Sequence, residues 1–131
     1  DMAETPATDA HVSIAVPADP SFASVLRAVA AAVAARLDLP IDDLEDLRLA
    51  VDEAFASLLT LCDGGTRITL RLTPVGGGVA AYLVTDGTGT SWPPAAGELA
   101  RQVLTALADE VTFDAREGAP SVSIVKRSTR G

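Results

Sequence analysis

The sequence is short of the residues on which covalent cross-links, metal sites and cationic surfaces depend. Its 131 residues include one cysteine, one histidine and one lysine. A single cysteine cannot form an internal disulfide, so Cys62 fits a reducing cytoplasm, and we expect it to be a small buried residue at a helix end. Because His11 has no second histidine or cysteine pair near it, we expect a residue at a strand edge instead of a metal ligand or a catalytic base.

Long apolar runs are also missing. The most apolar stretch extends from Ala28 to Ala35, far less than the roughly 20 residues that cross a bilayer. No basic segment precedes an apolar one, so we expect a cytoplasmic protein that does not enter membranes. The net charge of −8 disfavours a nucleic-acid surface, because phosphate binding needs clustered cations, and instead suits a partner with a basic surface.

What the chain does contain is regular apolar spacing. The length suits one domain, and a hydrophobic content of 48% suffices for a packed core. Alternation predicts five strands, at residues 11–16, 66–73, 79–85, 111–114 and 122–125. Recurrence at three and four residues predicts three helices, at residues 20–37, 42–62 and 98–109, with caps at Asp19 and at Asp42 or Asp43.

This order predicts an α+β two-layer sandwich, in which a mixed, largely antiparallel sheet of about five strands packs on three helices. We expect a flexible arm at residues 1–10, a single domain at 11–127 and a tail at 128–131, with the basic residues from Lys126 onward solvated. The first helix should bury a stripe and present an alanine-rich opposite side on which another helix or chain could pack; the stripe comprises Phe22, Val25, Leu26, Val29, Val33 and Leu37. The third helix should turn inward Leu99, Val103, Leu104 and Leu107.

The second helix carries two polar residues on one face. Glu53 and Ser57 are four residues apart, so they lie one above the other and away from the apolar stripe. Two interpretations stay open from the spacing alone: the pair lines a cleft, or both side chains are simply solvated.

The residues around this pair resemble a known motif. The stretch Asp46-Leu-Arg-Leu-Ala-Val-Asp-Glu-Ala54, with Ser57 after it, resembles the N-box of the GHKL (Bergerat-type) ATPases, and more narrowly the RsbW-like anti-sigma-factor serine kinases. Residues 104–111 and 123–127 are similar to the last third of that family. The sequence Val84-Thr-Asp86-Gly-Thr-Gly89 occupies the place of its adenine-binding box. The resemblance covers roughly residues 12–127.

The resemblance implies an ATP and Mg²⁺ site. Glu53 would act on the nucleophile that attacks the γ-phosphate, and Ser57 stands where the family uses an asparagine to hold Mg²⁺. Asp86 would accept a hydrogen bond from the adenine amino group, with Gly87 and Gly89 after it. A serine hydroxyl has less reach than an amide carbonyl, and these glycines come one residue earlier than in the family pattern.

The phosphate lid departs furthest from the family. Related kinases carry a Gly-x-Gly at the start of the third helix, whose backbone N–H groups hold phosphates. Here Glu98 and Ala100 occupy those places, after a short loop that contains Trp92. These departures predict a degenerate nucleotide site. Trp92 itself has two interpretations, packing over the cleft or contact with a partner.

Three functions follow. The resemblance implies an anti-sigma factor, a homodimer that sequesters an RNA polymerase sigma factor and is released by an anti-anti-sigma partner. The alternative is an active ATP-dependent kinase that phosphorylates the anti-anti-sigma factor, with Glu53 and Asp86 essential. The third is a scaffold of the same fold with an unrelated partner. By analogy, candidate partner contacts are Arg27, Arg36, Asp42, Asp46 and Arg48.

Overall fold

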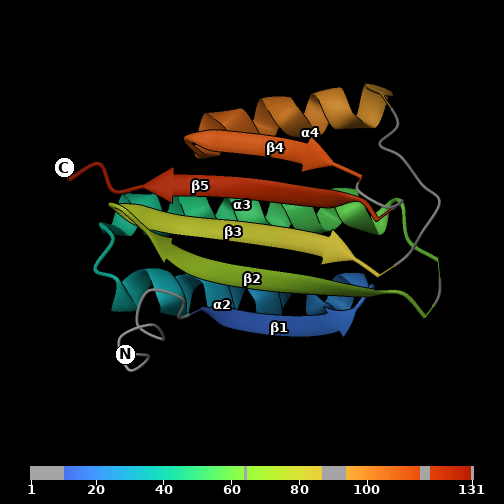
Figure 1. Ribbon diagram of the computed structural model, residues 1–131, viewed down its shortest axis with the longest axis horizontal. Helices are drawn as coiled ribbons and strands as arrows, with labels where there is room; N and C mark the ends of the chain where they lie inside the picture. Colours follow the sequence, from blue (N-terminus) through green and yellow to red (C-terminus); the bar gives the residue numbers. More distant parts are fainter. Residues whose placement is uncertain (1–10, 64, 87–93, 116–118, 131) are drawn as a thin grey trace, which may run out of the picture.

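The computed structural model describes residues 11–63, 65–86, 94–115 and 119–130, with the side chains of residues 94–96 excluded. The strands are β1 (Val12–Pro17), β2 (Arg67–Val75), β3 (Gly78–Thr85), β4 (Glu110–Asp114) and β5 (Ser121–Arg127). A short 3₁₀ turn, η2 (Pro20–Phe22), precedes α2 (Ala23–Arg36), and the other helices are α3 (Ile41–Leu59) and α4 (Pro94–Leu107) (Figure 1). Within these residues, no helix is long and apolar enough to span a membrane.

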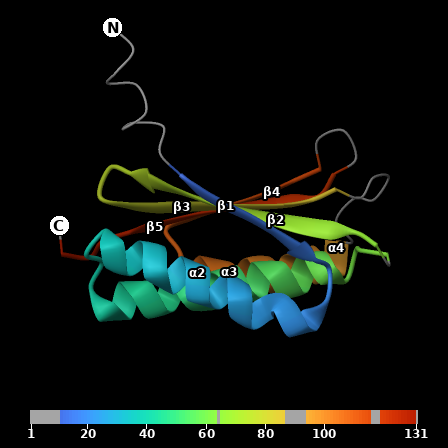
Figure 2. The same ribbon diagram turned by 90° about the horizontal axis from the view of Figure 1, so that it is seen from below.

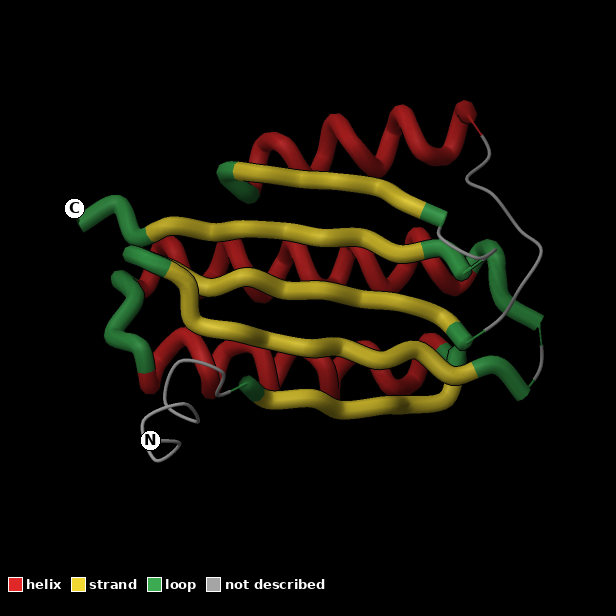
Figure 3. Tube along the Cα trace, in the orientation of Figure 1, coloured by secondary structure: helices red, strands yellow, loops and turns green. Residues whose placement is uncertain are grey.

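The strands form one sheet in the order β1-β2-β3-β5-β4, and each neighbouring pair is antiparallel. All three helices lie against the same face of this sheet, as Figure 2 shows, and the tube in Figure 3 gives the same two layers by colour. The predicted α+β two-layer sandwich is therefore confirmed. The opposite face of the sheet carries no helix of the described chain.

The alternation of apolar and polar residues along β2 correctly predicts which of its side chains are buried in the core. Ile68, Leu70 and Leu72 are fully buried, while Arg67 and Arg71 between them are exposed. Leu70 pairs with Leu83 of β3, so the two strands present their apolar side chains on the same face. The period of two therefore aims one row of side chains at the helices and the other at solvent.

The buried face of α2 differs from the prediction, because it includes alanines. On α2 the fully buried residues are Leu26, Ala30 and Ala34, whereas Val25 and Leu37 are each 37% exposed. Small side chains let the axis of α2 approach its neighbour closely, so part of the alanine side faces the core. The predicted stripe was wrong at Val25 and Leu37.

The starts of the helices agree with the sequence prediction only in part. Asp19 accepts the N–H of Ser21 at 2.8 Å, as expected of a cap, although the first turn is 3₁₀. The residue before α3 is Pro40, and neither predicted aspartate caps this helix. Helix α4 begins at Pro94, because proline fits the first turn of a helix, and its Leu99 is 64% exposed where an inward side chain was predicted.

Candidate functional site

The predicted pair on α3 lies at a groove between two helices. Glu53 and Ser57 are half-buried, and the Ser57 hydroxyl donates to Oε2 of Glu53 over a long 3.4 Å. Both residues line an open groove of about 260 Å³, together with Ala56, Thr60, Leu99 and Ala100. The cleft interpretation of the helical spacing therefore fits the geometry, since α3 supplies one wall and α4 the other.

Asp86 lies beyond the end of β3, at the same end of the molecule as the last turns of α3 and the start of α4 (Figure 1). Its Oδ1 accepts the backbone N–H of Arg67 at 2.9 Å, and its own N–H donates to the Arg67 carbonyl. Asp86 is not among the residues that line the Glu53 groove. One of its carboxylate oxygens thus already holds the start of β2.

Cys62 follows α3 at this end. Burial, and then the charges of Asp86 and Asp63, raise the pKa of its thiol. The thiol lies 3.2 Å from the carbonyl oxygen of Leu58. A raised pKa disfavours the thiolate, so this environment does not activate a nucleophile.

The start of α4 bears directly on phosphate binding. In an α-helix that begins at Pro94, the N–H groups of Glu98 and Ala100 donate to carbonyls four residues earlier. They therefore do not point at a ligand, unlike the first N–H groups of a helix. Glu98 is exposed, and the Ala100 side chain is buried against the groove. The two lid positions thus lie inside a regular helix.

The described residues include only part of the predicted nucleotide site. Gly87, Gly89 and Trp92 lie outside the described residues. Among the described residues no group of three or more histidine, cysteine, aspartate and glutamate side chains is arranged to hold a metal ion. Of the predicted nucleotide residues, the structure therefore brings together Glu53 and Ser57, with Asp86 at the same end of the molecule.

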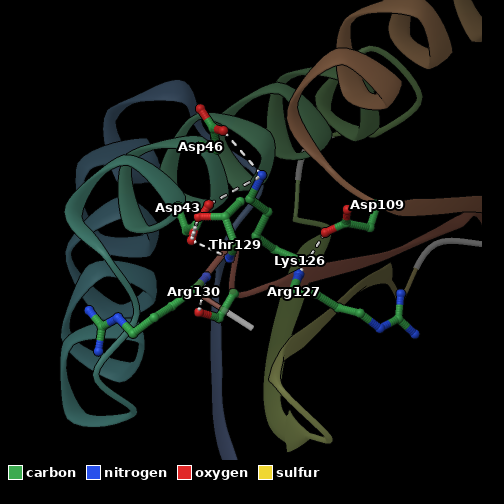
Figure 4. Close-up of polar contacts among 8 residues, drawn as sticks. Asp43, Asp46, Asp109, Lys126, Arg127, Thr129 and Arg130 are labelled. Atoms are coloured by element: carbon green, nitrogen blue, oxygen red, sulfur yellow. Dashed lines mark hydrogen bonds and ion pairs between the residues drawn. The ribbon is translucent and has the colours of Figure 1, made fainter.

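A buried ionic cluster at the opposite end of α3 was missed from the sequence. Asp43 is only 2% exposed, and its Oδ2 accepts both the N–H and the hydroxyl of Thr129, at 2.8 and 2.9 Å (Figure 4). Lys126, 8% exposed, lies 3.1 Å from Asp46 and 3.8 Å from Asp43. The prediction of solvated basic residues from Lys126 onward was therefore wrong at Lys126, which binds the first turns of α3, whereas Arg127 and Arg130 are exposed.

This environment favours the charged form of Asp43. The backbone hydrogen bond from Thr129 lowers the pKa of the carboxyl group, and burial opposes the shift in part. The Thr129 hydroxyl and the charges of Lys126 and Arg130 lower it further. Asp43 therefore accepts hydrogen bonds from the chain end as a carboxylate instead of capping its own helix.

Ion pairs also occupy most of the candidate partner contacts. Arg27 on α2 binds Asp52 of α3 at 2.7 Å, and Arg48 binds Glu45 at 2.6 Å. Asp46 is bound to Lys126, as described above. Of the five candidates, Arg36 and Asp42 are exposed and form no ion pair with another described residue. Asp52, next to Glu53 in the chain, thus links two helices.

Comparison with known proteins defines the fold. No protein-family model and no curated protein sequence matches this chain. The crystal structure of the RsbU and RsbW domains of Rv1364c from Mycobacterium tuberculosis matches 90% of this chain, with a TM-score of 0.67 and 18% identity. This chain covers 32% of that chain, about a third of its length. The class of protein is thus an α+β sandwich with an RsbW-like fold, and at this identity the likeness concerns the fold alone.

Proposed function

We propose that this protein is an anti-sigma factor that binds and sequesters an RNA polymerase sigma factor without transferring phosphate. The observation that carries the proposal is the position of Glu98 and Ala100 within α4. Their N–H groups are used inside the helix, and the exposed carboxylate of Glu98 repels a triphosphate. The RsbW-like fold supports a regulator of sigma factors, and an anti-anti-sigma partner, a homodimer and a cytoplasmic location belong to the same proposal.

Charge supports a basic partner. The chain carries 18 acidic and 10 basic residues, and several of its arginines are paired internally. A sigma factor must present basic surface to DNA, and complementary charge accelerates association with such a surface. We therefore expect sigma binding to weaken as salt rises.

The test uses each purified sigma factor of the source organism. We expect one of them to co-elute with this protein in the absence of nucleotide, and to lose activity with core RNA polymerase in transcription assays. Co-elution that requires ATP and Mg²⁺, or no binding to any sigma factor, would contradict the proposal.

A kinase is the second candidate. Glu53 and Ser57 meet at a groove, and Asp86 lies at the same end of the molecule, which is the arrangement that the family resemblance implies for ATP. The test is transfer of labelled phosphate from ATP to an anti-anti-sigma protein. Transfer that disappears in Glu53→Gln would establish the kinase and exclude a regulator that works by binding alone.

A further inference from the structure

The outer face of the sheet, opposite the helices, holds a polar hollow. Its volume is about 470 Å³, and its lining comes from four strands: Arg71, Tyr82, Thr112, Asp114, Ser121 and Ser123. In the described chain no helix covers this face (Figure 2). The hollow is separate from the Glu53 groove, which lies on the helical side.

Strand register explains why these side chains meet. In the register of the strands, Arg71 lies opposite Tyr82, Tyr82 opposite Ser123, and Ser123 opposite Thr112. One row of residues therefore crosses the sheet from β2 to β4. Neighbouring strands lie about 4.8 Å apart, so the row extends roughly 14 Å. Ser121 and Asp114 pair with each other in the next outward row, because residues two apart share a face.

The lining is rich in hydrogen-bonding groups that the protein itself does not use. In the described part of the chain, the side chains of Arg71, Tyr82 and Ser121 make no hydrogen bond or ion pair, and the same holds for Thr112 and Ser123. Ser121 is only 4% exposed, and buried hydroxyls usually have a partner. A ligand in the hollow would supply that partner.

Charge indicates the chemistry of the ligand. Three arginines elsewhere, Arg27, Arg48 and Arg127, are paired with carboxylates, whereas Arg71 has no such partner among the described residues. Among the described residues that line the hollow, Arg71 is the cation, and Asp114 at the other end accepts the N–H of Ala115. A guanidinium surrounded by hydroxyl donors matches the oxygens of a phosphate group, and the remaining hydroxyls suit a polyol.

We propose that this hollow binds a small phosphorylated molecule, with the phosphate on Arg71 and hydroxyl groups of the ligand on Ser121 and Ser123. The hollow is open and polar, which suits a hydrated small molecule better than an apolar protein segment. The proposal is independent of sigma binding, because it uses the other face of the sheet.

The test is a titration of the full chain with glucose 6-phosphate, inorganic phosphate and glucose, followed by amide NMR. We expect saturable shifts at outward residues of β2, β3, β4 and β5 with glucose 6-phosphate. If inorganic phosphate binds equally well, free phosphate is the ligand; if the ester binds more tightly, the ligand is a phosphorylated polyol. Either result supports an anion site, whereas no saturable shift at millimolar ligand would overturn it.

Matched variants locate the site. Arg71→Ala should weaken binding about tenfold or more, because a charge-assisted contact is lost, while Arg36→Ala, an exposed arginine on α2, should leave it unchanged. Ser121→Ala should weaken binding severalfold, unlike Ser24→Ala, which changes an exposed serine on α2. Equal effects of the test and control variants would overturn the proposal. Amide shifts that depend on protein concentration instead of ligand concentration would also overturn it, because they would assign this face to a second copy of the chain.

Discussion

The two ends of helix α3 use polar side chains in opposite ways. At the first turns, Asp43 is buried and accepts two hydrogen bonds from Thr129, while Lys126 lies between Asp43 and Asp46. Toward the last turns, Glu53 and Ser57 share one long contact and line an open groove. The first set therefore maintains the fold, and the second is available for binding. This assignment predicts that substitutions at the two ends will have different consequences.

The largest effect should come from Asp43→Ala. The change removes two hydrogen bonds to a charged acceptor and leaves Lys126 with Asp46 alone, so we expect a loss of about 2–3 kcal/mol in the free energy of unfolding. Urea denaturation measures it. Asp42→Ala, an exposed neighbour, is the control and should change stability by about 0.5 kcal/mol or less. Similar losses for the two variants would show that the buried cluster does not stabilise the fold.

The next effect concerns the groove end. A triple variant, Ser57→Asn with Glu98→Gly and Ala100→Gly, should lose about 2 kcal/mol, because each glycine weakens α4 by roughly 1 kcal/mol. It should also gain affinity for ATP, since the loosened backbone frees N–H groups and removes a carboxylate. Calorimetry compares it with Ser57→Asn alone. A flat titration with the triple variant would mean that the helical N–H groups are not what excludes nucleotide.

Acid should destabilise the first end of α3 selectively. The pKa of Asp43 is lowered in the folded protein, so its contribution is complete above the ordinary carboxyl pKa of about 4 and is lost as the pH falls through the lowered folded-state value. Asp43→Asn lacks this contribution. The stability difference between wild type and Asp43→Asn should therefore shrink between pH 7 and pH 2 in urea denaturation. A constant difference over that range would contradict the assignment.

The smallest effect should come from Glu53→Ala. Glu53 is half-buried and has only the 3.4 Å contact with Ser57, so we expect a change in unfolding free energy of about 0.5 kcal/mol or less. Sigma binding, measured by co-elution, should stay nearly intact. A loss of sigma binding that parallels a requirement for ATP would show that the groove is a working nucleotide site.

Features set by local spacing could be predicted from the sequence. Alternation located Ile68, Leu70 and Leu72 in the core, and a separation of four residues placed Glu53 beside Ser57. The buried cluster could not be predicted, because Lys126 and Asp46 are 80 residues apart in the chain and Thr129 and Asp43 are 86 apart. Before the fold is known, nothing local distinguishes Lys126 from a solvated lysine.

The start of α4 shows the same limit in a different form. Proline and glycine at Pro94 and Gly97 are typical of a loop, yet proline is also favoured in the first turn of a helix. Helix α4 packs on α3, with Ala100 and Leu104 buried and Leu99 64% exposed. Because α4 begins at Pro94, Glu98 and Ala100 lie within the helix and not at its first residues, where free N–H groups could bind phosphate.

Calorimetric titration of the purified protein with ATP, with and without Mg²⁺, tests the central claim directly. A regulator that acts by binding alone should give no Mg²⁺-dependent heat at millimolar nucleotide, while it still binds its sigma factor. Micromolar, Mg²⁺-dependent binding would contradict that account and establish a working nucleotide site at the Glu53 groove.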